Sequence, residues 1–316
     1  MIISYKNNGG ERLDKFLAGR FLKYSRSYLQ KLIENNSVSV NGDAVKSNQI
    51  LKVGDRIEIK FDKQSKKIDL KPANIKLDIL FENNDIIILN KPAGLVVHPA
   101  AGNYDNTLVN ALLNHFPSII SARHDESDIS KIRPGIVHRL DKDTSGVLIA
   151  AKNQRALRLI SKQIKNRNVK KIYLALCFGW PRSEKGRITS YLGRHHKNRK
   201  VISDIGIEKG KEAVSNYRLI KKWEISGFKI SLIEFNIKTG RTHQIRYQAK
   251  SIGIPLLGDF IYGTKDSILF SKKMKIRRQL LHAKEISFYL PGDNKLSHFS
   301  APTPADFNLA YKTSQV

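Results

Sequence analysis

Residues 135–151 read Gly-Ile-Val-His-Arg-Leu-Asp-Lys-Asp-Thr-Ser-Gly-Val-Leu-Ile-Ala-Ala and join a polar, turn-rich loop to an apolar run. The apolar run, Val147–Ala151, predicts a buried β-strand. The loop packs a carboxylate, Asp141, together with an arginine and small hydroxyl residues. An ordinary surface turn contains the same residue types, so that interpretation stays open at this point. A calcium-binding loop is excluded, because Lys152 stands where that motif requires a bidentate glutamate.

Apolar stretches of strand or helix length recur on both sides of this segment. Strands are predicted for Ile86–Leu89, Tyr173–Phe178, Phe228–Ile237 and Ile286–Leu290, and helices for Thr107–Phe116 and Gln154–Lys165. The strands outnumber the helices and do not alternate strictly with them. This pattern predicts an α+β domain built on a mixed, largely antiparallel β-sheet.

The N-terminal residues follow a different pattern. Between Arg12 and Lys60 the sequence predicts two short helices followed by short strands, with Ser25 as the N-cap of the second helix. Asn41-Gly42-Asp43 predicts a turn between strands. We therefore expect a small α/β module with basic residues on its helices.

A polar, charged stretch follows this module and has little periodicity. The whole chain has 316 residues, which exceeds the usual size of one domain. We predict an N-terminal module over residues 1–62, a linker over 63–76 and a larger domain over 77–316.

The charge balance favours a polyanionic partner. The chain has 56 Lys and Arg residues against 28 Asp and Glu residues, a net charge of +28 and a pI near 10.1. Such a charge binds phosphates through direct contacts and counterion release, so nucleic acid is the first candidate. A lysine-rich composition without a selected function is the alternative interpretation.

Cysteine content and hydropathy indicate a compartment. The one cysteine, Cys177, excludes an internal disulfide framework and a cysteine-based metal site, and it points to a reducing environment. The sequence contains neither a signal-peptide pattern nor an 18-residue apolar run. We therefore expect a cytoplasmic protein that is not inserted in a membrane.

Three further segments carry polar residues that are suited to chemistry or to RNA. Residues 238–246, Lys-Thr-Gly-Arg-Thr-His-Gln-Ile-Arg, are rich in donors for phosphate or carboxylate, and an exposed basic loop is the alternative interpretation. Residues 91–99 form either a functional turn or a structural corner between two short strands. Tyr173 follows a lysine pair at the start of a strand, where a core position is the simpler interpretation.

Together these segments resemble the RluA/RluD family of pseudouridine synthases. The resemblance covers nearly the whole chain and rests on the following motifs: Arg12-Leu-Asp-Lys15, Tyr24-Ser-Arg-Ser27, His98-Pro99, His138-Arg-Leu-Asp141, Arg241-Thr-His-Gln-Ile-Arg246, Leu257-Gly-Asp259, Tyr262-Gly263 and Leu281-His-Ala283. Val97-His98-Pro99 and Arg194-His195 make the chain most similar to the D type, which modifies large-subunit rRNA. The N-terminal module resembles an RNA-binding domain shared with a ribosomal small-subunit protein.

The resemblance implies the pseudouridine synthase fold and an isomerisation that needs no cofactor and no metal. Asp141 is then the essential carboxylate, acting either as a nucleophile at the ribose C1′ or as a base toward the ribose. The family pattern places Arg246 against this aspartate, where its charge favours the ionised carboxylate. Tyr173 is expected to lie against the target base and to take part in removing the proton from C5.

The resemblance also implies residues that handle the RNA. The target base must leave its stack, and Arg139 is the candidate for the side chain that fills the gap. His138, Arg241 and His243 are assigned to the substrate RNA, with His138 also shaping the loop. Basic residues expected to bind RNA phosphates are Arg26, Lys31, Arg194, Lys197 and Arg199. The expected partner is large-subunit rRNA, alone or in the assembling subunit.

Two other enzyme classes lack their motifs in this sequence. An RNA methyltransferase would need a Gly-x-Gly-x-x-Gly loop, and a nucleotide-driven RNA remodeller would need a Gly-x-x-x-x-Gly-Lys-Ser/Thr loop. A non-catalytic RNA-binding factor for ribosome assembly remains the alternative. The chain departs from the family at Tyr247, where many relatives have Val-His after the arginine, and in a longer, acidic insert over residues 124–131.

Overall fold

The computed structural model describes residues 1–7, 10–21, 26–61, 70–99, 103, 105–122, 133–196, 198, 201–293 and 295–307, apart from the side chains of Ser27 and Lys31. The chain divides into two compact units, Met1–Leu70 and a larger unit made of Lys71–Ala122 and Pro134–Val316. The limits at residues 62 and 77 that the sequence suggested stay predictions.

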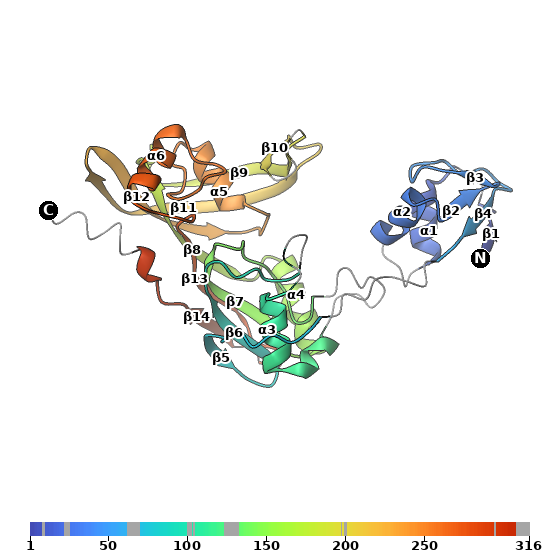
Figure 1. Ribbon diagram of the computed structural model, residues 1–316, viewed down its shortest axis with the longest axis horizontal. Coiled ribbons are helices and arrows are strands. Elements are labelled where there is room, and N and C mark those ends of the chain that lie inside the picture. The colour runs from blue at the N-terminus through green and yellow to red at the C-terminus, as the bar shows by residue number, and fades with distance from the viewer. Residues whose placement is uncertain are drawn as a thin grey trace. The chain divides into compact units, whose positions relative to one another are not determined.

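The smaller unit combines two helices with a four-stranded sheet (Figure 1). Its elements are β1 (Ile2–Ser4), α1 (Leu13–Arg20), α2 (Arg26–Glu34), β2 (Val38–Val40), β3 (Asp43–Ala44) and β4 (Arg56–Ile59), with the strand order β1-β4-β2-β3. Asn41 and Gly42 both have positive φ, 55° and 93°, which a tight turn between β2 and β3 requires. The predicted N-cap, Ser25, lies outside the described residues. The sequence did not suggest β1, because three residues are too few to show an alternating pattern.

The larger unit is built on one ten-stranded sheet, in which nine strands follow the order β10-β9-β11-β12-β8-β13-β7-β6-β5 and the tenth, β14, pairs with β13. The strands are β5 (Ile79–Glu82), β6 (Ile86–Lys91), β7 (Ser145–Ala151), β8 (Lys170–Phe178), β9 (Lys185–Arg194), β10 (Ile202–Asp204), β11 (Lys211–Ile225), β12 (Phe228–Ile237), β13 (Leu281–Tyr289) and β14 (Leu296–Ser300). Neighbouring strands are antiparallel except β7 and β13, which are parallel. The prediction of an α+β domain on a largely antiparallel sheet is confirmed.

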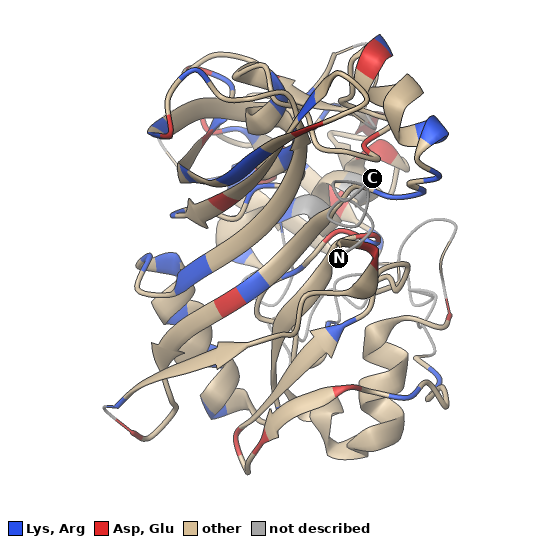
Figure 2. Cartoon of the chain, turned by 90° about the vertical axis from the view of Figure 1, so that its left-hand side faces the viewer, with Lys and Arg blue, Asp and Glu red and all other residues tan. Residues whose placement is uncertain are grey.

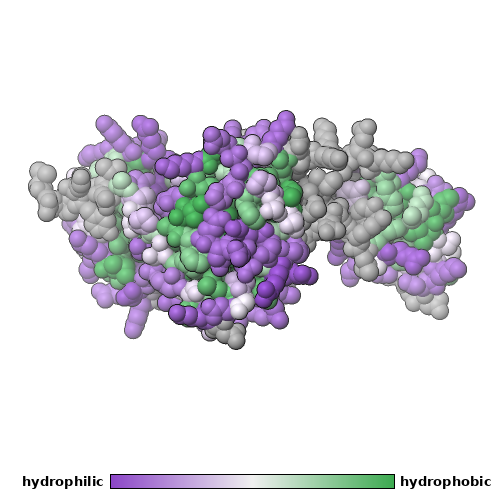
Figure 3. Space-filling model, turned by 90° about the horizontal axis from the view of Figure 1, so that it is seen from below, coloured by the Kyte–Doolittle hydropathy of each residue, from purple (hydrophilic) through white to green (hydrophobic). Residues whose placement is uncertain are grey.

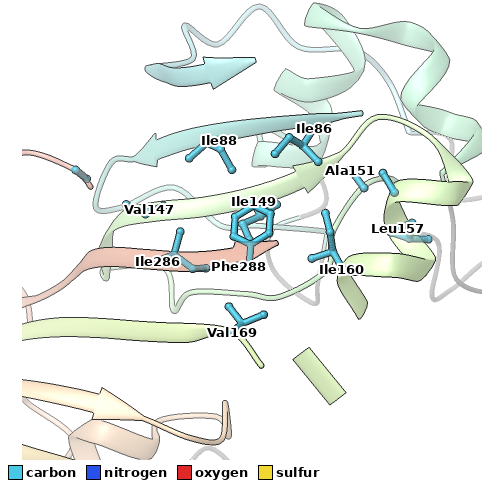
Figure 4. Close-up of a cluster of buried hydrophobic side chains, with 12 residues drawn as sticks. Ile86, Ile88, Val147, Ile149, Ala151, Leu157, Ile160, Val169, Ile286 and Phe288 are labelled. Carbon is cyan, nitrogen blue, oxygen red and sulfur yellow. The ribbon is translucent and has the colours of Figure 1, made fainter. Parts of the chain in front are cut away.

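Helices accompany this sheet along its length (Figure 1). They are α3 (Leu108–His115), η1 (Pro117–Ser121), α4 (Gln154–Lys165), α5 (Gln244–Ser251), α6 (Lys265–Lys273) and η3 (Ala305–Phe307). Asn153 caps α4 by accepting a hydrogen bond from Ala156 N at 2.9 Å. The apolar side of α4 packs on β6, β7 and β13, where Ile149, Ile160 and Phe288 are fully buried (Figure 4). This core anchors β7, the strand that follows the Asp141 loop.

Gly146 explains how β7 can lie so close to β13 immediately after that loop. Its φ is +111°, and a Cβ at this position would overlap the backbone of Ala283 in the parallel pair. Only glycine fits both the conformation and the close approach. Because Gly146 is five residues after Asp141, this contact fixes where the loop ends and the chain enters β7.

The outer surface is mostly hydrophilic in the view of Figure 3, with smaller apolar areas between the polar side chains. None of the helices in the described part of the chain is long and apolar enough to cross a membrane.

Candidate functional site

Asp141 lies in the loop between residue 136, which bridges to Ala150, and the start of β7. A turn closes the loop, since Thr144 N donates to Asp141 O at 3.1 Å. The Asp141 side chain is 19 % exposed, and it lines a cavity of about 70 Å³ together with Tyr173, His243 and Arg246. The loop, β8 and the segment after β12 therefore meet at one carboxylate.

Two cations hold the residues that follow Asp141. The ammonium of Lys91 donates to the carbonyl oxygens of Lys142 at 2.9 Å, Leu95 at 2.9 Å and Pro92 at 2.7 Å. Arg278 donates to Asp143 O at 2.8 Å, and its other nitrogens bind the Asp306 carboxylate. The loop backbone is thus fixed by Lys91 and Arg278, neither of which lines the cavity, and this leaves the Asp141 carboxylate little freedom.

Arg246, in the first turn of α5, supplies the positive charge closest to Asp141. Its Nη1 lies 3.4 Å from Asp141 Oδ2, while Nε and Nη2 bind Asp259 at 2.7 and 2.9 Å. Burial opposes the charge of Arg246, but the hydrogen bonds and charge of Asp259 outweigh it and raise the pKa of the guanidinium. Arg246 therefore stays charged beside Asp141.

A buried polar network fixes the start of α5. The side-chain oxygen of Gln244 accepts hydrogen bonds from Thr239 Oγ1 at 2.8 Å and Arg241 N at 3.0 Å. Its amide nitrogen donates to Val214 O at 3.1 Å and Ser215 Oγ at 2.9 Å on β11. Each of these polar groups is satisfied, so the network locks the turn that delivers Arg246 to the site.

His243 and Tyr262 complete this side of the cavity. His243 occupies a left-handed conformation, φ 53°, immediately before α5, and its Nδ1 lies 2.9 Å from Tyr262 Oη. The other ring nitrogen, Nε2, faces Asp141 Oδ2 at 3.9 Å. Tyr262 Oη also accepts from Ile202 N at 2.8 Å, and its ring lies under the Arg246 guanidinium. Tyr262 thus contacts both the His243 ring and the Arg246 guanidinium, the two groups that face Asp141.

Tyr173 lies on β8 with 7 % of its surface exposed, and it lines the same cavity. Burial raises the pKa of its phenol, and the charge of Asp141 raises it further. Tyr173 is therefore a neutral phenol at physiological pH, with a ring wall against which a planar base can pack.

The other residues expected at the site have distinct positions. Arg139 is exposed and lines the cavity, and Arg241 is exposed with Nε bonded to Glu212 O at 2.9 Å. His138 is turned toward the sheet, where its Nε2 accepts from Ile149 N at 3.0 Å. Its burial lowers its pKa to about 3, with Lys171 adding to the effect. The neutral ring fits the loop-shaping part of its expected role.

The predicted RNA-binding residues are spread over the two units. Arg26 and Arg12 both bind Asp14, which is fully buried, and Arg26 keeps 45 % of its side chain exposed. Burial opposes ionisation of Asp14, but the hydrogen bonds from Arg12, Arg26 and Gln30 prevail and lower its pKa to about 2. Arg194 is exposed at the end of β9. The side chain of Lys31, and Lys197 and Arg199 as a whole, lie outside the described residues.

Sequence reasoning missed several groups that build the site. Lys91 and Asp259 lie in motifs that we singled out, but nothing in the motifs reveals which carbonyls or cations they bind. Arg278 carries no local signal, because its partners Asp306 and Asp143 are 28 and 135 residues away. Lys171 appeared only as half of a lysine pair. In the described residues no three His, Cys, Asp or Glu side chains gather where they could hold a metal ion.

Comparison with known proteins identifies the family to which the chain belongs. The RNA pseudouridylate synthase family matches residues 85–251, which include Asp141, Tyr173 and Arg246, and the S4 domain family matches residues 11–57. An uncharacterised RNA pseudouridine synthase of Synechocystis is 40 % identical over 94 % of this chain and 87 % of its own length. The ribosomal large subunit pseudouridine synthase D of Borreliella burgdorferi is 39 % identical over the same shares of the two chains.

Solved structures agree with these sequence matches. The human RNA pseudouridylate synthase domain containing 1 has a TM-score of 0.58 and 25 % identity, covering 74 % of this chain and 86 % of its own. The human domain containing 4 protein shares the fold, with a TM-score of 0.55 and 21 % identity over 75 % of this chain and 92 % of its own. The chain belongs to the RNA pseudouridylate synthase family, isomerases that act on uridine in RNA, and carries an N-terminal S4 domain.

Proposed function

We propose that this enzyme converts specific uridines of large-subunit rRNA to pseudouridine in the cytoplasm, with Asp141 as the essential carboxylate. The observation that carries the role of Asp141 is its position in a cavity between the charged guanidinium of Arg246, 3.4 Å away, and the ring of Tyr173. The substrate proposal draws on relatives named ribosomal large subunit pseudouridine synthase D, which are 35–39 % identical to this chain.

The reaction breaks the bond between the ribose C1′ and N1 of uracil and forms a bond between C1′ and C5. The proton leaves C5 and one is gained at N1, so atoms and electrons balance without a co-reactant. Asp141 acts either at C1′ as a nucleophile or on the ribose as a base. Both roles need an ionised carboxylate, and the charged guanidinium of Arg246 lies 3.4 Å from it.

Tyr173 and the cavity mouth act on the base and the strand. The neutral phenol of Tyr173 packs against uracil while the base turns, and its oxygen is available for proton movement at C5. A stacked uridine must be flipped into so small a cavity, and we assign Arg139, which is exposed and lines the cavity, to the gap that the base leaves. Arg241 and His243 then contact the RNA around the flipped nucleotide.

The basic surface positions the RNA without reading its sequence. Lys and Arg residues recur on strands, helices and loops of the face shown in Figure 2. We assign Arg26, Lys31, Arg194, Lys197 and Arg199 to RNA phosphates, and we propose that the RNA is presented as part of an assembling large subunit or as free rRNA.

Mapping of pseudouridine by carbodiimide in total RNA tests this function. Cells with the intact gene, a deletion and Asp141→Asn are compared. We expect the same large-subunit rRNA signals to disappear in both mutants, while purified Asp141→Asn keeps its affinity for rRNA, because the amide preserves the shape of the side chain and removes only its charge.

An unchanged map in both mutants would refute the proposed substrate. A deletion that impairs subunit assembly, together with an Asp141→Asn strain that assembles normally and keeps every pseudouridine, would favour the non-catalytic assembly factor.

A further inference from the structure

A second cavity, of about 380 Å³, adjoins the one that contains Asp141. Both cavities are lined by Arg139, Tyr173, Ile237, Gly240 and Arg241. A ligand in the second cavity can therefore contact the same five residues that line the cavity for the flipped base.

Lys171 is the buried cation of this second cavity. It lies on β8 two residues before Tyr173 and has 7 % of its surface exposed. Its Nζ approaches the loop backbone at Gly240, since a Cβ at that glycine would lie 3.7 Å from it. Within the residues that the structure describes, the Lys171 ammonium has neither a hydrogen-bond acceptor nor an anionic partner.

The charges around Lys171 are positive as well. Burial lowers the pKa of Lys171 to about 8, and the charge of Arg241 contributes in the same direction. Lys171 in turn disfavours protonation of His138. The described lining of the cavity also includes Lys165, Arg167, Lys238 and Arg139, all exposed, and no carboxylate; Arg167 is paired with Glu212 at 2.7 Å, and Glu212 is not part of the lining. A desolvated ammonium among cations is unfavourable unless an anion enters.

We propose that this cavity binds a backbone phosphate of the RNA strand next to the target uridine, with Lys171 as its buried anchor. The ammonium supplies charge and up to three donors to one phosphodiester. The exposed cations around it attract the strand. Arg241 lines both this cavity and the Asp141 cavity, so it lies beside the phosphate and beside the flipped nucleotide. Anchoring the phosphate beside Tyr173 fixes the nucleotide whose base has left the stack. This inference rests on the proposed function.

The first test compares Lys171→Met with Lys170→Met. Lys170 is the exposed neighbour on β8 and does not line the cavity, so it controls for loss of one positive charge. Each change is made in full-length Asp141→Asn protein, and binding to a synthetic hairpin that carries the mapped uridine is measured from low to high salt.

We expect Lys171→Met to weaken binding roughly tenfold at low salt, as for loss of a charged hydrogen bond. The slope of log K against log salt should fall by about one phosphate equivalent. For Lys170→Met, the slope should stay close to that of the wild-type protein. Equal slopes for the two lysine variants would overturn the assignment. Lys171→Arg keeps the charge and should restore most of the slope, which a merely structural role for Lys171 does not predict.

The second test locates the phosphate. Each phosphodiester flanking the target is replaced in turn by a neutral methylphosphonate. One position should weaken binding to protein with Lys171 and have little further effect on Lys171→Met, as expected for two groups in direct contact. The same loss in both proteins at every position would refute the contact.

Product formation by the wild-type enzyme is measured separately on the same hairpin and on rRNA. If the wild-type forms no pseudouridine, the proposed function fails. If it forms pseudouridine while Lys171→Met matches wild-type in slope and methylphosphonate sensitivity, only the phosphate site fails.

Discussion

Lys91 and Lys171 are both buried in the larger unit, yet their surroundings differ completely. Lys91 is 1 % exposed and has three carbonyl acceptors for the three N–H groups of its ammonium, one of them from Lys142 in the Asp141 loop. Lys171 is 7 % exposed, lines a cavity, and is affected by the positive charge of Arg241. Burial lowers the pKa of both ammonium groups, to about 7 for Lys91 and about 8 for Lys171.

The difference separates a structural cation from a binding cation. An ammonium whose donors are all used within the fold stabilises the backbone that it bonds. An ammonium that is desolvated without a partner lowers stability, and the fold retains it at a site where a ligand supplies the anion. The two lysines should therefore respond to substitution with opposite signs of stability change.

The largest expected effect is that of Lys91→Met. The change leaves the carbonyls of Pro92 and Leu95 without their donor and removes one of two donors from Lys142 O. At about 1–3 kcal/mol for each buried unsatisfied group, the free energy of unfolding should fall by roughly 3 kcal/mol. Urea unfolding measures it, with the exposed Lys142→Met as the matched control.

The Asp141 loop should also lose its alignment in Lys91→Met. Turnover should fall more than the affinity for RNA, because the loop carries the carboxylate and not the main phosphate contacts. A stability within about 0.5 kcal/mol of wild-type, the usual range for a surface change, would contradict the structural role.

A smaller effect is expected for Arg278→Met. This arginine binds Asp143 O and the carboxylate of Asp306, and its side chain is 12 % exposed. Asp306 is more exposed and can be hydrated again, so we expect a loss of about 2 kcal/mol in unfolding free energy and roughly a tenfold loss of kcat. The neighbouring exposed Arg277→Met should change neither quantity measurably. Equal behaviour of the two variants would show that the clamp on Asp143 does not position the loop.

Much of the architecture could be predicted from the sequence, because it rests on local patterns. The run at 147–151 and the amphipathic stretch at 154–165 appear as β7 and α4. The motif around Asp141 and the resemblance that it carries indicated which residues come together. Such motifs identify residues that share a site but give no distances between them.

The contrast between the two lysines could not be predicted. Lys91 lies at the end of an apolar strand and Lys171 at the start of one. No sequence pattern distinguishes an ammonium with hydrogen-bond acceptors from one without them. The acceptors of Lys91 include a carbonyl 51 residues away, and Arg241 is brought to Lys171 by the pairing of β8 with β12. Long-range packing decides which lysine is satisfied, whereas periodicity reports only that both positions are buried.

The smallest expected effect, and the one of opposite sign, is that of Lys171→Met on stability. Lys171 differs from Lys91 in its partners: no carbonyl or anion in the described residues offsets the burial that lowers its pKa to about 8, so its charged form lowers stability at neutral pH, whereas three carbonyls bond the Lys91 ammonium. Replacing it with a neutral side chain of similar length should raise the free energy of unfolding by about 1 kcal/mol at pH 7.

Between about pH 8 and 10.5 the unfolded chain binds more protons at Lys171 than the folded protein does. The stability of the wild-type enzyme therefore gains on that of the variant as pH rises, and the difference should shrink toward zero. Urea unfolding of both proteins at pH 7 and pH 9.5 measures this, and a variant less stable than wild-type at pH 7 would place Lys171 with Lys91 among the structural cations.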